Sequence, residues 1–468
     1  MVGPSSYFTP SRIDELAAEQ RELVGRRERL LGNAYRLFYD QPVEIVRGSG
    51  TLLYDADGTE YLDVYNNVPS VGHSHPRVVE AIARQAAQLN THTRYLNRGI
   101  VDYSSDLLAT LPDGLDNAMF TCTGSEANDL ALRLAKAVTG HAGVIVTRNA
   151  YHGVTTEIAA ISPSLGGLDT VAPWVRVVEA PVGDGLTFVR QVAAAINELR
   201  DSPHGLAAVI VDTIFASDGV RPAPTAPGSP GFLAPVVAAA HAAGGLVIAD
   251  EVQAGFGRLG SWSDAPHRFA EPASGLWGFS RHGIVPDIVT LGKPMGNGMP
   301  IAAMLARRDL VDEFGSRMRY FNTFGGNPVS IAAAQATLNI LRDEQLPLNA
   351  RRVGDSLRAQ LRDLAHTTPE LGEIRGAGLF IGIDIIDADG RPDEARTIAL
   401  LNELRRRHVL IGASGLANST LKVRPPLLFS PADADRFLTE LAGAVQAVRG
   451  SSTSASGTTP RGRASEQI

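Results

Sequence analysis

The chain has 468 residues, of which 44% are hydrophobic and 20% charged, a composition typical of a globular enzyme with a large core. Its net charge of −7 argues against a general nucleic-acid-binding function. The single cysteine, Cys122, excludes an intrachain disulfide and suits a reducing compartment. No apolar stretch is long enough to span a membrane, and the first residues lack a signal-peptide pattern, so we expect a cytoplasmic protein with no membrane partner.

The first predicted element is a helical arm over residues 11–38, where leucine and isoleucine recur at helical spacing. Short β-rich runs follow at 43–46, 52–54 and 60–63, with glycine-containing turns between them. These runs predict a small set of antiparallel hairpin strands.

Beyond residue 63 helical and strand patterns alternate. Short unbroken apolar runs, typical of strands covered on both faces, lie at 144–146, 207–211, 246–249 and 288–291. The pattern predicts an α/β fold whose large domain contains a mostly parallel, doubly wound sheet.

Toward the C-terminus, helical and strand patterns predict a smaller α/β domain packed with the arm. These patterns are helices near 330–345, 393–407 and 431–449, with strands at 380–384 and 421–424. The predicted organisation is an arm with hairpin (1–60), a large domain (61–330), a small C-terminal domain (331–449) and a disordered, low-complexity tail (450–468).

A lysine stands directly after the last of the four apolar strands, in Gly292-Lys293-Pro294. Ligands bind at the carboxyl ends of strands in α/β sheets. Burial there lowers the pKa of a lysine toward that of a nucleophilic free amine. The alternative for Lys293 alone is a surface lysine after an edge strand.

Other strand ends carry further candidates. A helix predicted to open at Gly124-Ser125 offers free backbone N–H groups and a hydroxyl to a phosphate, although Ser125 can equally be a plain N-cap. Asp250 ends an apolar strand and can either pair with a ring nitrogen or cap a following helix. Tyr151 can stack on a planar cofactor or be a turn aromatic, and His152 by itself is more typical of a structural residue.

A helix N-terminus that can bind phosphate, an acidic residue, an aromatic ring and a lysine at one sheet edge are the groups that bind pyridoxal 5′-phosphate. Further motifs are Asp57-Gly58, Tyr61-Leu-Asp63, Gly72-His-Ser-His-Pro76, Gly124-Ser-Glu-Ala-Asn128, Tyr151-His-Gly153, Asp250-Glu-Val-Gln253, Gly255-Phe-Gly-Arg258, Thr323-Phe-Gly-Gly-Asn-Pro328, Arg375-Gly-Ala-Gly378 and Pro425-Pro426. With these motifs, from about residue 35 to about 447, the chain resembles class III aminotransferases of pyridoxal-phosphate-dependent transferase fold type I.

The resemblance implies that Lys293 is the Schiff-base lysine and Asp250 the partner of the pyridine nitrogen. It also implies a set of further cofactor-binding residues: Gly124, Ser125, Tyr151, His152, Asp212, Gln253 and, reaching over from a second subunit, Thr323. A shared site makes a homodimer necessary, and whether dimers pair into tetramers stays open.

Two other motifs do not indicate sites. His73 and His75 have no third metal ligand at suitable spacing, so we expect no metal. Gly376-Ala-Gly378 is not a dinucleotide-binding loop, because a strand pattern follows it where a helix would open.

Several segments resemble the phospho-lyase branch of the class, typified by ethanolamine-phosphate phospho-lyase. They are Asn66-Asn-Val68, Thr93-Arg-Tyr-Leu96, Ala109-Thr-Leu-Pro112, the stretch 285–298, Tyr320-Phe-Asn-Thr323 and Leu421-Lys-Val-Arg-Pro-Pro426. The chain also departs from common aminotransferases: Asp212 replaces their usual glutamate, Lys422 replaces an arginine, and 264–276 resembles an insertion.

The phospho-lyase resemblance implies elimination of phosphate from O-phosphoethanolamine or a similar phosphorylated amine, which gives an aldehyde, ammonia and phosphate. Candidates to bind the substrate phosphate are Asn66, Asn67, Arg94, Lys422 and Arg424, although each can equally be structural. The alternative is an ω-aminotransferase, which hands the amino group to a keto acid. A non-catalytic binding protein of the same fold is less favoured, because Lys293 and Asp250 are both present.

Overall fold

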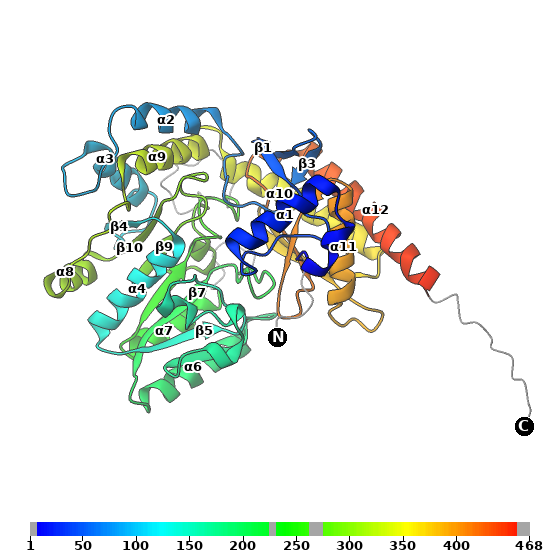
Figure 1. Cartoon of the computed structure of the whole chain (residues 1–468). Coiled ribbons are helices and arrows are strands. Elements are labelled where there is room, and N and C mark those ends of the chain that lie inside the picture. Colours follow the sequence, from blue (N-terminus) through cyan, green and yellow to red (C-terminus); the bar gives the residue numbers. More distant parts are fainter. Residues whose placement is uncertain (1–6, 224–230, 262–274, 456–468) are drawn as a thin grey trace, which may run out of the picture.

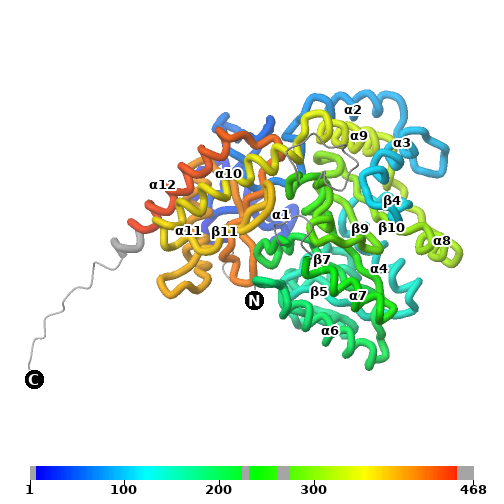
Figure 2. The backbone as a smooth tube through the Cα atoms, turned by 180° about the vertical axis from the view of Figure 1, so that it is seen from behind, coloured from blue at the N-terminus to red at the C-terminus, as the bar shows by residue number. Residues whose placement is uncertain are grey.

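The computed structural model describes residues 7–223, 231–261 and 275–455 and arranges them around three β-sheets (Figure 1). The largest sheet and its helices lie on one side, and two smaller sheets from the two ends of the chain lie on the other, as Figure 2 shows from behind. The domain boundaries given above stay predictions. The segment 264–276 lies, except for its last two residues, outside the described ranges.

The N-terminal arm consists of the 3-10 helix η1 (Pro10–Glu15) and helix α1 (Ala18–Leu31). The predicted helix over 11–38 is therefore too long. Gly32 has a φ of 73°, a left-handed conformation that ends α1 because it breaks the helical dihedrals.

After α1 the chain returns to the body of the protein. Tyr7 forms a β-bridge with Phe38, and their rings stack with centroids 5.5 Å apart. The Tyr39 hydroxyl donates to the Ile411 carbonyl and accepts from the Ile411 N–H, both at 3.0 Å. The arm is thus fastened to the C-terminal part of the fold.

The predicted hairpin set is confirmed by β1 (Ile45–Ser49), β2 (Leu52–Asp55) and β3 (Glu60–Asp63), with antiparallel pairing. Gly58, at φ 82°, makes the turn between β2 and β3. A fourth strand, β13 (Val409–Leu410), pairs parallel with β3, so this sheet also joins the two ends of the chain.

The largest sheet has seven strands in the order β4-β10-β9-β8-β7-β5-β6. The bounds are β4 (Asn117–Thr121), β5 (Gly143–Thr147), β6 (Val175–Val178), β7 (Leu206–Asp212), β8 (Leu246–Asp250), β9 (Ile288–Leu291) and β10 (Ala302–Ala306). Strands β5 to β9 are parallel, and β10 runs antiparallel to β4 and β9. The mostly parallel sheet is confirmed. The sequence pattern misses β10 because an alanine-rich run is equally helical in propensity.

Helices cover both faces of this sheet, which confirms the doubly wound α/β architecture. Val144 and Val146 of β5 pack with one set of helices, and Ile145 between them packs with the other. The first set is α4 (Gly124–Thr139), α5 (Thr156–Ala159) and α8 (Arg308–Arg317), and the second is α6 (Leu186–Arg200) and α7 (Leu233–Ala242). Helices α2 (Pro76–Ala86), α3 (Arg98–Leu108) and α9 (Pro328–Asp343) pack together at one end (Figure 1).

The C-terminal sheet has the order β11-β12-β15-β14. Its elements are α10 (Leu346–His366), β11 (Leu371–Ala377), β12 (Phe380–Ile385), α11 (Glu394–Arg406), β14 (Gly412–Ser414), β15 (Thr420–Val423) and α12 (Pro431–Ala455). The Gly376-Ala-Gly378 motif lies at the β11–β12 hairpin. Helix α12 runs six residues into the stretch predicted as a tail, and 456–468 lie outside the described residues.

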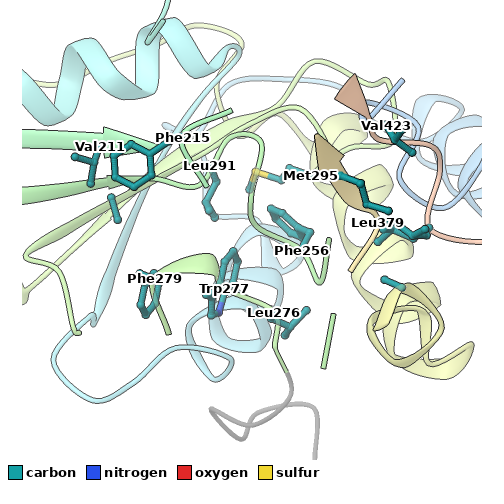
Figure 3. Close-up of a cluster of buried hydrophobic side chains, with 14 of the residues drawn as sticks. Val211, Phe215, Phe256, Leu276, Trp277, Phe279, Leu291, Met295, Leu379 and Val423 are labelled. Atoms are coloured by element: carbon teal, nitrogen blue, oxygen red, sulfur yellow. The ribbon is translucent and has the colours of Figure 1, made fainter. Parts of the chain in front are cut away.

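The main hydrophobic core is continuous between the largest sheet and the C-terminal sheet. Figure 3 shows part of it: Val211 and Leu291 belong to the largest sheet, and Val423 to β15. Met295 lies between Leu291 and Val423, and Leu379, in the turn between β11 and β12, lies on the side of the C-terminal sheet. Among the described residues, no helix combines the length and apolar character needed to cross a membrane.

Candidate active site

A cavity of about 270 Å³ lies at the carboxyl ends of β5, β7, β8 and β9, beside the N-terminus of α4. It is lined by every residue predicted to bind the cofactor except Thr323. Those lining residues are Gly124, Ser125, Tyr151, His152, Asp212, Asp250, Gln253 and Lys293.

The start of α4 presents backbone donors to this cavity. Thr123 and Glu126 form a capping box, in which the Thr123 hydroxyl accepts from the Glu126 N–H at 3.2 Å. The N–H groups of Gly124 and Ser125 precede it and have no intrahelical acceptor. A Cβ on Gly124 would lie 3.0 Å from the Val252 side chain, so glycine allows the helix to begin this close to the strand ends.

Asp250 is held at the end of β8 by three donors. Its Oδ2 accepts from Asn128 Nδ2 at 2.9 Å and lies 2.8 Å from His152 Nδ1, and its Oδ1 accepts from the Val252 N–H at 3.0 Å. In the described residues 251–261, which directly follow Asp250, no helix opens, so the alternative of a helix N-cap is wrong. The carboxylate is buried, yet it faces the cavity.

Lys293 lies opposite, directly after β9. Burial and the nearby positive charge of Arg424 lower its pKa, while Asp250 and Asp212 act in the opposite direction. Its Nζ lies 6.0 Å from the centre of the Tyr151 ring. The predicted environment of a desolvated lysine is confirmed, and the alternative of a surface lysine is wrong.

Asp212 ends β7 directly across from Asp250 in the strand register. Its two oxygens accept from the backbone N–H groups of Ile214 at 3.0 Å and Ala216 at 2.9 Å. Burial and the charge of Asp250 raise the pKa of Asp212 to about 6. Because both oxygens are tied to the local turn, the side chain is fixed in place.

Gln253 connects the cavity to the C-terminal sheet. Its Oε1 accepts from Arg424 Nη1 at 2.6 Å and from Asn67 Nδ2 at 3.5 Å, and the same Nη1 donates to Asn67 Oδ1 at 3.3 Å. The Arg424 guanidinium also stacks on Tyr65, 4.6 Å from the ring centre. All members of this network except Tyr65 are buried.

Lys422 lies in the strand β15, two residues before Arg424, which follows directly after the end of this strand. Its side chain is 8% exposed, and within the described ranges its Nζ has no hydrogen-bond acceptor. Burial, Arg424 and Lys293 lower the pKa of Lys422 well below its usual value, whereas Asp212 raises it. The structure therefore buries two basic side chains, called the cation pair below, beside each other next to the cavity, and a bound phosphate anion would favour the charged form of Lys422.

Three predicted residues lie elsewhere in this chain. Arg94 is exposed, with its guanidinium 3.9 Å above the Phe321 ring, and Thr323 is exposed in the loop before α9. Asn66 is half-buried, and its backbone N–H donates to Asp63 at 2.9 Å. Within one subunit the structure does not bring these three side chains to the cavity.

Sequence reasoning gave Asn128 no role, although it stands in the quoted Gly124-Ser-Glu-Ala-Asn128 motif. Its amide donates to Asp250 and to the His152 carbonyl, and its Oδ1 accepts from the Thr290 hydroxyl at 2.6 Å. The available signal was a polar residue on the apolar face of α4, four residues after Gly124. Within the described part of the chain, no group of three or more His, Cys, Asp or Glu could hold a metal ion.

The chain is similar in sequence and in fold to several known proteins. The structure superimposes with a TM-score of 0.84 on a phospholyase from Arthrobacter in complex with phosphoethanolamine, which is 41% identical and covers 91% of this chain and 99% of that one. The ethanolamine-phosphate phospho-lyase homolog 1 of Caenorhabditis elegans is 35% identical over 463 residues, covering 92% of this chain and 95% of that protein. The alanine–glyoxylate aminotransferase 2-like protein of Drosophila melanogaster is 35% identical over 456 residues, covering 92% and 89%.

The fold is that of pyridoxal-phosphate-dependent enzymes of fold type I, as the sequence motifs predict. The family model of class-III aminotransferases matches residues 37–445, and the chain belongs to this family. Its members depend on pyridoxal 5′-phosphate, and the family includes both aminotransferases and phospho-lyases.

Proposed function

We propose that this protein is a pyridoxal-phosphate-dependent phospho-lyase. Its substrate is O-phosphoethanolamine or a closely similar phosphorylated amine, and its products are an aldehyde, ammonia and phosphate. The observation that supports this most is the buried pair of cations, Lys422 and Arg424, beside a cavity that contains a desolvated lysine. The Arthrobacter and Caenorhabditis elegans relatives point the same way.

The residues of the cavity fit the cofactor. The free N–H groups at the start of α4 suit its phosphate. Asp250, fixed by Asn128 and His152, suits its pyridine nitrogen, and Tyr151 at the mouth suits its ring face. Lys293 is the residue that would bond its aldehyde. When bound, the cofactor supplies an electron sink for the electron pair left by a departing proton.

The chain's own residues supply binding and proton transfer. Lys293, whose lowered pKa favours the neutral amine, takes the proton from the amine-bearing carbon of the substrate. The bond between the neighbouring carbon and the phosphate oxygen then breaks, and the phosphate leaves with that electron pair. Lys422 and Arg424 stabilise the negative charge of the leaving phosphate in a water-poor environment.

The proposal is tested with purified holoenzyme, O-phosphoethanolamine and no keto acid. We expect acetaldehyde, ammonia and phosphate in equal amounts over many turnovers. The second candidate is an ω-aminotransferase, favoured by the Drosophila relative. Absence of these products, together with turnover of an ω-amine plus pyruvate, would reject the lyase in favour of that candidate. A Lys293→Ala variant should lose the visible absorbance of the lysine-bound cofactor, and an unchanged spectrum would show that another lysine bonds it.

We also propose a homodimer. Exposed apolar side chains cluster in the sequence around Arg94 and Thr323: Tyr95 and Leu96 are 67% and 99% exposed, and Phe324 is 70% exposed. Covering this surface with a second copy would bring Arg94 and Thr323 to the partner's cavity. Light scattering should give a dimer or a multiple of it, and a monomer with full activity would contradict the shared site.

A further inference from the structure

A second cavity, of about 360 Å³, borders the two buried basic side chains of Lys422 and Arg424. Lys422 and Arg424 form part of its lining. Arg424 also bonds Gln253, which lines the first cavity, and the charges of Lys293 and Asp212 act on Lys422. Lys422 and Arg424 therefore line the second cavity and also interact with residues that line the first.

One wall of this second cavity consists of aromatic rings from residues that flank the N-terminal arm and from the residues after β3. Tyr7 stacks on Phe38, and Phe38 meets Tyr65 edge-on with centroids 5.1 Å apart. The arm is held in place by the Phe8 N–H, which donates to the Leu37 carbonyl at 2.8 Å, and by the Tyr39 hydroxyl. This wall is a defined surface suited to the alkyl part of a ligand.

Polar groups lie in the rest of the lining. Glu394 and Asn418 are joined by a hydrogen bond of 3.3 Å and line the cavity, as does Ser164. A carboxylate and hydroxyl or amide groups suit the hydroxyls of a neutral alcohol. The Glu394 carboxylate disfavours a second anionic group in the same space.

The second cavity provides space that the proposed monoester substrate would not occupy. With its amine at Lys293 and its phosphate at Lys422 and Arg424, O-phosphoethanolamine ends at the cations and leaves the second cavity unused. The volume of the second cavity, about 360 Å³, falls within the range of small-molecule binding sites. A phosphate that carries a second ester group would place that group there.

We propose, building on the phospho-lyase function, that the enzyme also accepts phosphodiesters of ethanolamine whose second ester is a small neutral polyol, such as glycerophosphoethanolamine. The proton leaves the amine-bearing carbon, and the ethanolamine C–O bond breaks with its electron pair on the phosphate oxygen. The organic phosphate leaves as a monoester, here glycerol 3-phosphate. Water then hydrolyses the remaining two-carbon fragment to acetaldehyde and ammonia, so the atoms and charges balance without another reactant.

The first test gives the holoenzyme glycerophosphoethanolamine or O-phosphoethanolamine, each without a keto acid. We expect acetaldehyde and glycerol 3-phosphate in equal amounts from the diester, with kcat/KM within about 10-fold of the monoester value. Turnover of the monoester alone would overturn this inference and leave the proposed function standing. Turnover of neither would refute both.

A substitution in the lining of the second cavity tests the role of this cavity separately from the role of Lys422 and Arg424. Leu416 lines this cavity, is 63% exposed and is not one of the two proposed phosphate ligands. Leu416→Trp should fill the space and lower kcat/KM for the diester by about 10-fold or more while the monoester value stays within about 2-fold. Leu416→Ala is the matched control and should retain both activities. Equal losses for both substrates in Leu416→Trp would overturn the assignment.

Inhibition gives a readout that does not depend on diester turnover. Glycerol 3-phosphate should inhibit monoester turnover at a concentration about 10-fold lower than inorganic phosphate, because its glyceryl group gains contacts in the second cavity. In Leu416→Trp that difference should disappear. Equal inhibition by the two anions in the unmodified enzyme would contradict the inference.

Discussion

Replacing Lys422 by methionine should have opposite effects on stability and activity. Lys422 is buried beside Arg424, and it has no hydrogen-bond acceptor among the described residues. Methionine keeps a similar length and removes the charge. A buried, uncompensated ammonium costs stability, whereas a substrate phosphate needs it.

The sign of the stability effect follows from the lowered pKa of Lys422. The unfolded chain binds this proton below about pH 10.4, and the folded chain does so only at lower pH. Wild-type stability therefore falls as pH drops below that value, at a limit of about 1.4 kcal/mol per pH unit. Because the pKa of Lys422 is lowered in the folded chain, the Lys422→Met variant should gain stability relative to wild type as pH drops below about 10.4, until the folded wild-type chain binds the proton as well.

The activity effect follows from one lost charge-assisted contact. Such contacts contribute about 1.5–3 kcal/mol, so kcat/KM for O-phosphoethanolamine should fall by about 10- to 150-fold. Thermal melts across pH and phosphate-release kinetics measure the two effects on the same sample. Lys422→Arg is the charge-conserving control. Unchanged kcat/KM in Lys422→Met, or a melting temperature that falls relative to wild type as pH drops, would refute the reasoning.

Three further predictions concern residues around the cavity. Arg424→Met should lower the free energy of unfolding by about 1–3 kcal/mol, because it leaves the buried Gln253 and Asn67 without their hydrogen-bond donor. This effect is opposite in sign to that of Lys422→Met, and unfolding by denaturant measures it. Asn128→Ala should weaken cofactor retention by about 10-fold, as measured by absorbance during dialysis, because it removes a donor from the Asp250 carboxylate. The melting temperature of Asp212→Asn should increase relative to that of wild type as pH rises from about 4 to about 6. In that pH range the folded wild-type protein keeps the Asp212 proton and the unfolded chain does not, so wild-type stability falls as pH rises. A constant difference across that window would contradict the pKa assignment.

The local parts of the site were predictable from sequence because each is encoded by a strand and the residues directly after it. Lys293 and Asp250 follow unbroken apolar runs, and Gly124 precedes a clear helical period. Parallel strands place their carboxyl ends at one edge, so these residues meet without knowledge of any long-range contact. Because each of these motifs follows a strand of one parallel sheet, the sequence indicated that they line a single cavity.

Long-range contacts were not predictable in this way. The bond between Gln253 and Arg424 joins residues 171 positions apart and depends on how β15 docks beside the largest sheet. Secondary-structure propensity also fails to decide between two conformations that are close in energy. Examples are strand and helix in the alanine-rich β10, and continuation or end of the helix at Gly32. Arg94 was chosen by position in a motif, and only the structure shows that it lies on the surface of its own subunit.

The pairing of β3 with β13 has a consequence for synthesis. Strand β13 and the cation-bearing strand β15 are made near the end of translation, after the residues around Lys293. A nascent chain can therefore build the pocket for the cofactor before it has the groups proposed to hold a phosphate substrate. Until the C-terminal region leaves the ribosome, the hairpin sheet presents β3 as an open edge, which is a surface that other strands can pair with.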